Sequence, residues 1–112
     1  MSIRISGGRL KGRLIGSPQV ANGVRPTTER VKLAIFSIIT TCSVQDKSVL
    51  DLYSCTGALG LEAISRGSAT VDMVEKNFKN YELILENVKK LEVQDVAKVY
   101  KSTVRDFLNH IN

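Results

Sequence analysis

The chain has 112 residues, which is enough for one domain with one hydrophobic core and too short for two. Apolar residues make up 43% and charged residues 24%, the balance of a folded soluble protein, and no apolar run approaches the roughly 18 residues that a membrane span needs. The net charge of +5 is unevenly spread, since residues 1–40 hold seven bases and one acid while residues 41–112 hold nine bases and ten acids. This asymmetry indicates that the N-terminal part meets a polyanion, and the alternative is a basic surface that serves only solubility.

The first ten residues lack the apolar stretch of a signal peptide. Cys42 and Cys55 do not make a disulfide framework, and neither stands at a metal-ligand spacing. We therefore expect a cytoplasmic protein with free thiols and no bound metal.

The N-terminal segment is predicted as a basic β-hairpin with a loop, over residues 1–24. Residues 3–5 and 10–15 are typical of two short strands around Gly7 and Gly8, and residues 16–23 of a loop. An isolated hairpin of two short strands is only marginally stable, so this hairpin must pack on another element. Its basic side chains are Arg4, Arg9, Lys11 and Arg13.

A helix is predicted to open around residues 25–29 and to end near Thr40. Pro26 lies just before its start, Thr27 or Thr28 can cap the free N–H groups, and Glu29 suits the positive end. Apolar residues at helical spacing form one stripe, which we expect to face the core: Val31, Ala34, Ile35, Ile38 and Ile39.

Residues 48–111 read as alternating strands and helices. We expect a buried, nearly all-apolar strand over 48–53, a tight turn over 54–57, a helix over 58–65 that Gly67 stops, and a strand over 70–74 that ends at Glu75. Asn77 can cap a helix that runs to Leu91, followed by a strand over 97–101 and a helix over 104–111. The inner face of the Asn77 helix is predicted to carry Tyr81, Ile84, Leu85, Val88 and Leu91. This order predicts an α/β fold with a parallel sheet and right-handed crossovers.

Three features converge where the strands of such a sheet end, which is where ligands bind. The turn from Asp51 to Gly57 has small residues that let backbone amides approach a ligand. Glu75 follows 24 residues after Asp51, and a carboxylate there can accept both hydroxyls of a ribose. Ser102 and Thr103 end the third strand, where an adenine edge could be recognised. The alternatives are an ordinary glycine turn and a solvated strand end, but the joint spacing favours nucleoside-cofactor binding.

The run Asp51-Leu52-Tyr53-Ser54-Cys55-Thr56-Gly57-Ala58-Leu59-Gly60-Leu61-Glu62-Ala63 resembles the D-L-F-x-G-[ST]-G-x-L-G-[LI]-E-A signature of the RsmD family. These are Rossmann-like class I methyltransferases that use S-adenosylmethionine to methylate the N2 of a guanine in 16S rRNA. The resemblance extends over nearly the whole chain, through Arg4–Gly8, Lys11–Arg13, Arg25–Thr28, Arg30-Val31, Val74–Lys76 and Glu86-Asn87.

The resemblance implies roles for named residues. The loop that holds the methionine part of the cofactor would contain Asp51, Tyr53, Ser54 and Gly57. Glu75 would bind the ribose, Ser102 and Thr103 the adenine, and Thr27 and Thr28 would close over the amino-acid end of the cofactor. The hairpin would bind the RNA through Arg4, Arg9, Lys11 and Arg13. Residues 25–112 would form the N-terminal part of the methyltransferase domain.

The sequence departs from the family pattern at two points. Cys55 stands where the family has glycine, so a positive φ there would cost roughly 1 kcal/mol and the thiol could crowd the cofactor. No base stands near enough in sequence to make Cys55 a nucleophile. The family's catalytic Asp-Pro-Pro-Tyr or Asp-Pro-Pro-Phe motif is absent, since the two prolines are Pro18 and Pro26. We therefore assign no catalytic residue in this chain, expect it to be inactive alone, and expect an open edge on the first strand of the sheet.

Two rival functions stay open at this point. The chain could be a nucleic-acid-binding module with a vestigial cofactor fold, which cofactor titration would distinguish. It could also be a nucleotide-dependent oxidoreductase, since a ribose-binding carboxylate is common to both classes. The second rival is weakened because Cys55, Gly57 and Gly60 do not reproduce a G-x-G-x-x-G loop.

Overall fold

The computed structural model describes residues 2–17, 29–39 and 43–111, with nine helices and strands among them. In chain order these are β1 (Ser2–Arg4), β2 (Leu14–Gly16), α1 (Glu29–Ile39), β3 (Ser48–Asp51), α2 (Ala58–Ser65), β4 (Thr70–Glu75), α3 (Phe78–Lys90), β5 (Ala97–Lys101) and α4 (Val104–His110). Within those described ranges, no helix is long and apolar enough to cross a membrane.

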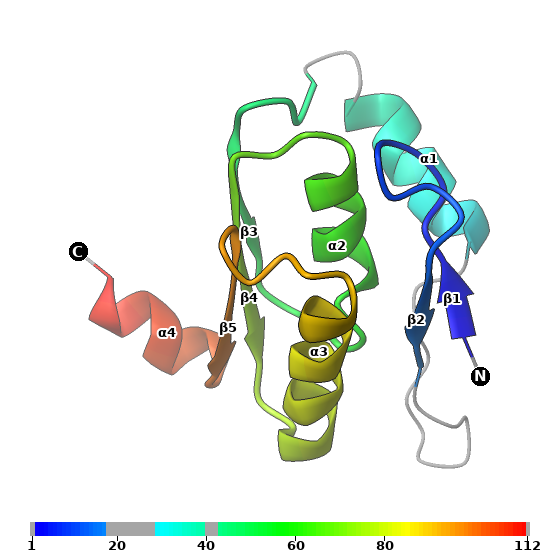
Figure 1. The fold of residues 1–112 in the computed structure, drawn as a ribbon. Helices are drawn as coiled ribbons and strands as arrows, with labels where there is room; N and C mark the ends of the chain where they lie inside the picture. The colour runs from blue at the N-terminus through cyan, green and yellow to red at the C-terminus, as the bar shows by residue number, and fades with distance from the viewer. Residues whose placement is uncertain (1, 18–28, 40–42, 112) are drawn as a thin grey trace.

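A parallel sheet of three strands, in the order β3-β4-β5, is the centre of the fold. Helices α2 and α3 cover one face of the sheet, and α4 lies on the other (Figure 1). This arrangement confirms the predicted α/β class. Strand β3 lies at one edge and pairs only with β4 in the part of the chain that is described.

The core lies between the sheet and the layer of α2 and α3. Val71 and Met73 of β4 are fully buried against Leu61 and Ile64 of α2 and Ile84 of α3. Helix α3 begins at the predicted cap, since the Asn77 side chain accepts a hydrogen bond from the Asn80 N–H. The predictions for α2, β4, α3, β5 and α4 are therefore confirmed to within a residue or two.

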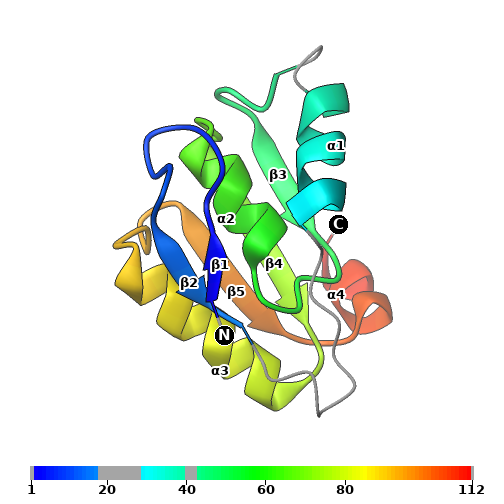
Figure 2. The ribbon, with the colours of Figure 1, turned by 90° about the vertical axis from the view of Figure 1, so that its right-hand side faces the viewer.

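Strands β1 and β2 form the antiparallel hairpin, which lies outside α2 and α3 (Figure 2). The predicted second strand, over 10–15, is wrong at its start because β2 begins at Leu14. Residues 6–13 form a longer turn, closed by hydrogen bonds from the Ile5 N–H to the Arg13 carbonyl and from the Gly12 N–H to the Ile5 carbonyl. Gly8 and Gly12 allow the turn its left-handed backbone, with φ values of 77° and 88°. The hairpin does pack on another element, since Ile5, Leu10 and Ile15 are buried.

Helix α1 packs beside α2, and the predicted apolar stripe forms its inner face only in part: Ile35 packs against the core, but two other members do not. Val31 is 49% exposed and Ala34 is exposed, whereas Lys32 and Phe36 are buried. The side chains of Ile38 and Ile39 lie outside the described part. The prediction is wrong for Val31 and Ala34, because Lys32 pairs with a buried carboxylate on α2, which no local pattern in α1 can reveal.

Two further burial predictions are wrong. The strand over 48–53 was expected to be buried throughout, but Leu50 is 44% exposed because β3 is an edge strand with one face open. Leu85 of α3 is 41% exposed, while Asn87 is buried. Successive helical residues differ by about 100° in direction, so Leu85 turns away from the core face that Ile84 and Val88 define.

Candidate functional site

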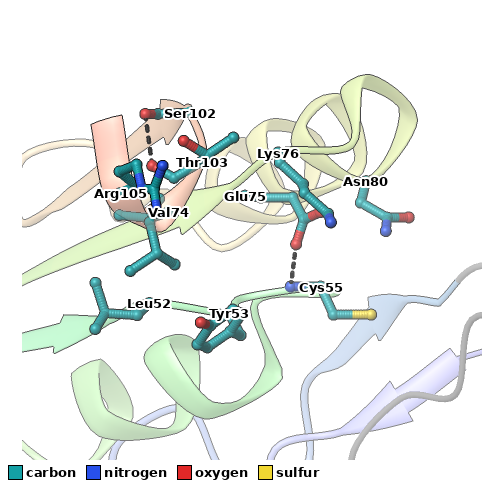
Figure 3. Close-up of a pocket in the computed structure, with 11 residues that line it drawn as sticks. Leu52, Tyr53, Cys55, Val74, Glu75, Lys76, Asn80, Ser102, Thr103 and Arg105 are labelled. Carbon is teal, nitrogen blue, oxygen red and sulfur yellow. Dashed lines mark hydrogen bonds between the residues drawn. The ribbon is translucent and has the colours of Figure 1, made fainter. Parts of the chain in front are cut away.

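A cavity of about 450 Å³ lies at the carboxyl ends of the three parallel strands. The segments that follow β3, β4 and β5 supply its walls, so residues far apart in sequence meet there (Figure 3). It is lined by Leu52, Tyr53, Cys55, Val74, Glu75, Lys76, Asn80, Ser102, Thr103, Val104 and Arg105. This is the position where an open parallel sheet binds its ligands.

Glu75 ends β4, and two backbone amides fix its carboxylate. The Cys55 N–H donates to Oε1 at 2.8 Å and the Asn77 N–H donates to Oε2 at 2.9 Å. Each carboxylate oxygen has a second lone pair, so Glu75 retains capacity for two hydroxyl donors. The residue predicted to bind a ribose therefore lies in the cavity with a fixed orientation.

Cys55 has a φ of 52°, so its backbone lies in the left-handed region that favours glycine. Its thiol is half-buried in the cavity wall. Burial raises the pKa of the Cys55 thiol, and the negative charges of Glu75 and Asp51 raise it further. The thiol therefore stays neutral at physiological pH, which does not suit a nucleophile.

Three more of the predicted cofactor residues line the cavity. Tyr53 is 79% exposed at its rim. The Ser102 N–H donates to the Glu75 carbonyl and its hydroxyl to the Thr103 carbonyl, which fixes the end of β5 against β4. The Thr103 hydroxyl caps α4 by accepting from the Asp106 N–H.

Asp51, Ser54 and Gly57 lie beside the cavity and do not line it. Asp51 lines a smaller hollow of about 170 Å³ between α1, β3 and α2, and its Oδ2 is buried without a hydrogen-bond partner among the described residues. Burial raises the pKa of Asp51, and hydrogen bonds from Ser54, Tyr53 and Gly60 oppose that rise. The Ser54 hydroxyl donates to the Asp51 carbonyl, and Gly57 has a φ of 82° at the start of α2. Asp51, Ser54 and Gly57 therefore shape the turn. The other two predicted cofactor residues, Thr27 and Thr28, lie outside the described residues.

Sequence reasoning missed part of the cavity wall. Leu52 and Val104 supply apolar surface beside the fully buried Val74, and Lys76, Asn80 and Arg105 supply polar groups. Each lies within five residues of the end of a strand, and this position in the sequence is the signal that could have identified them as cavity residues. Apolar walls beside one fixed carboxylate suit a ligand that has both a flat apolar ring and a sugar with adjacent hydroxyls.

The four basic hairpin residues are all exposed but differ in their contacts. Arg4 donates to the Gly12 carbonyl within the hairpin, and Arg13 donates to the Lys90 carbonyl at the end of α3. Within the described residues, the side chains of Arg9 and Lys11 have no hydrogen bond or ion pair. Those two cations are therefore wholly available to an anionic partner, while the exposed Arg4 and Arg13 keep further guanidinium N–H donors for one.

Asn87 of α3 connects the hairpin to the turn beside the cavity. Its side-chain NH₂ donates to the carbonyls of Gly16 and Thr56 at 3.0 and 3.1 Å, and its oxygen accepts from the Gly16 N–H at 2.8 Å. The residue is buried, so one side-chain amide fixes both β2 and the loop before α2. Among the described residues, no group of three or more His, Cys, Asp or Glu could hold a metal.

Comparison with known proteins gives consistent matches over almost the whole chain. The family described as "Conserved hypothetical protein 95" matches residues 3–112. "Ribosomal RNA small subunit methyltransferase D" of Escherichia coli K12 is 36% identical over 95% of this chain and 52% of its own length, and "Putative rRNA methyltransferase YlbH" of Bacillus subtilis is 35% identical over 89% and 53%. The solved structure "Putative methyltransferase yhhF from Escherichia coli" superposes with a TM-score of 0.84 at 31% identity, over 96% of this chain and 56% of that one. The chain thus spans about half the length of the curated relatives it matches.

Proposed function

Because the chain belongs to the family of ribosomal RNA small subunit methyltransferase D, we propose that it is the cofactor- and RNA-binding part of an S-adenosylmethionine-dependent methyltransferase. The substrate proposed is the N2 amine of a guanine in 16S rRNA. The observation that carries the proposal is the position of Glu75, whose carboxylate two amides hold at the carboxyl end of β4 in a cavity of about 450 Å³.

The residues present fit the cofactor. Glu75 has free lone pairs for the two ribose hydroxyls, and Val104 offers apolar surface for the adenine near Ser102 and Thr103. Tyr53 and Cys55 lie on the side that the preceding turn forms, where the methionine part would extend. Asp51, Ser54 and Gly57 would act through the shape of that turn, and Thr27 and Thr28 would close over the amino-acid end.

When bound, S-adenosylmethionine supplies a methyl group that its sulfonium already activates, so little acid–base chemistry is needed. The work left to this chain is to hold the cofactor in one orientation and to bring the RNA to it. The chain has no Asp-Pro-Pro-Tyr or Asp-Pro-Pro-Phe motif to hold the guanine, so we assign no catalytic residue within it.

Titration calorimetry with S-adenosylmethionine and its demethylated product tests the cofactor site. We expect Glu75→Ala to weaken binding by about 1–3 kcal/mol, the usual scale for lost charge-assisted hydrogen bonds. Glu82→Ala is the matched control, since Glu82 is an exposed carboxylate on α3 outside the cavity. Equal affinity in the Glu75 variant and the wild type would refute the ribose assignment.

The RNA-binding half of the proposal rests on Arg9 and Lys11. Their exposed side chains stand two residues apart on the hairpin turn, and phosphate contacts by such cations release counterions. Binding of a labelled rRNA fragment should therefore weaken with salt, by a slope of roughly −0.7 per phosphate neutralised on a single strand. Replacing both residues with Ala should lower that slope by about one to two units and leave cofactor binding unchanged. RNA binding without any cofactor binding would favour the nucleic-acid-binding module instead.

A further inference from the structure

Glu62 of α2 has a buried carboxylate that four donors surround. Its Oε1 accepts from the Ser6 N–H at 2.9 Å and lies 3.1 Å from Lys32 Nζ. Its Oε2 accepts from the Gly7 N–H at 2.9 Å and from Arg66 Nε at 2.8 Å. Four donors match the hydrogen-bonding capacity of a carboxylate, so Glu62 is fully occupied in joining the hairpin turn to α1 and α2.

Ser65 holds the same turn three residues further along α2. Its hydroxyl accepts from the Leu10 N–H at 2.9 Å and donates to the Gly7 carbonyl, while its own carbonyl accepts from the Arg9 N–H at 2.9 Å. Hydrogen bonds to the end of α2 therefore fix four backbone amides of the turn, those of Ser6, Gly7, Arg9 and Leu10.

Lys32 adds a third attachment, from α1. It is 1% exposed, and its ammonium donates to the Arg4 carbonyl at 2.7 Å as well as pairing with Glu62. Buried ion pairs contribute little net stability in general, because the loss of hydration offsets their attraction. The cluster of Glu62, Ser65 and Lys32 instead fixes the position of the turn that carries Arg9 and Lys11.

We propose that Glu62, together with Ser65, is a positioning residue for RNA binding, an inference that rests on the proposed role of the hairpin. The backbone around Arg9 is ordered before RNA arrives, so binding the phosphates costs less conformational entropy than it would from a loose loop. Neither Glu62 nor Ser65 touches RNA. Their removal should weaken binding without changing how many phosphates are neutralised.

The experiment compares salt series of RNA binding, by fluorescence anisotropy, for wild type, Ser65→Ala and Glu62→Gln. We expect affinity to fall about two- to tenfold, the scale of ordering one or two side chains, with an unchanged salt slope. Hydrogen exchange at the amides of Gly7 and Leu10 should accelerate in the same variants. Ser68→Ala is the matched control, because Ser68 is also buried and donates its hydroxyl to the Val44 carbonyl, away from the hairpin.

Each outcome separates the two proposals. If the Arg9/Lys11 double variant loses salt slope while Ser65→Ala keeps wild-type affinity, the hairpin binds RNA and the positioning role is refuted. A reduced slope in Ser65→Ala also overturns it, since the number of phosphate contacts would have changed. If wild type binds neither RNA nor cofactor, the proposed function itself fails. Should Glu62→Gln not fold, Ser65→Ala decides, because it removes no charge.

Discussion

Gly8 and Gly12 lie in one turn and both have positive φ, at 77° and 88°, but their surroundings differ. A Cβ on Gly8 would lie 1.9 Å from the Ser65 carbonyl oxygen, whereas a Cβ on Gly12 would meet nothing within 4 Å. Replacing each by Ala therefore separates the cost of the backbone conformation from the cost of losing contact with α2.

The loss of stability expected for each Ala variant follows from what the added Cβ would contact. Gly12→Ala should cost about 1 kcal/mol, the penalty for a Cβ in left-handed backbone. Gly8→Ala carries that penalty and also forces the turn away from α2, which breaks the hydrogen bonds from the Arg9 and Leu10 amides to Ser65. At about 1 kcal/mol for each bond, the total is about 3 kcal/mol.

Urea unfolding followed by circular dichroism gives the free energy of unfolding of each variant, from the midpoint of the transition and its slope with urea concentration. We expect Gly8→Ala to be the less stable variant by about 2 kcal/mol, the difference between the two totals. Equal losses in the two variants would mean that contact between the turn and α2 adds nothing beyond backbone strain, and the account of the hairpin would be wrong.

Three further results are expected. Cys55→Gly relieves the strain of a left-handed cysteine and widens the cavity, so S-adenosylmethionine should bind equally or more tightly by calorimetry; a marked loss would reveal a contact made by the thiol. Burial pushes the pKa of Glu62 up, but hydrogen bonds from Ser6, Arg66 and Lys32 outweigh burial and hold it below the ordinary 4.5. The stability that Glu62 contributes should thus be complete above pH 4.5 and fall as pH drops below it, a dependence that Tm measurements should not find in Glu62→Gln. Finally, the chain alone should transfer no tritiated methyl groups to small ribosomal subunits, with a full-length relative as positive control; incorporation would place the catalytic group inside these 112 residues.

Most of the parallel sheet and its crossovers could be predicted from local signals. The Asn77 cap, the stop at Gly67 and the short apolar strands each depend on neighbours in sequence, and those elements were confirmed. The position of Glu75 in the cavity also follows from its place after β4, because the ends of parallel strands share one edge.

The errors arise where distant residues decide local structure. Lys32 looks like a surface residue of α1 until Glu62, 30 positions later, provides a buried partner. The turn over residues 6–13 is fixed by Glu62 and Ser65, so its length could not be read from its own glycines. In the candidate site, the surroundings of Asp51 could not be predicted either, since it borders the hollow next to α1 and its Oδ2 is buried without a hydrogen-bond partner among the described residues.

Asn87 makes the fold sensitive to a chemical change that leaves its shape almost untouched. Replacing Asn87 by Asp puts an oxygen in place of the NH₂ group, and this oxygen would face the carbonyls of Gly16 and Thr56, where no donor remains. Two attractive contacts would become repulsive, one on the hairpin and one on the turn beside the cavity. An Asn87→Asp variant would therefore lose the attachment of β2 and the shape of that turn together, and it would gain one buried negative charge.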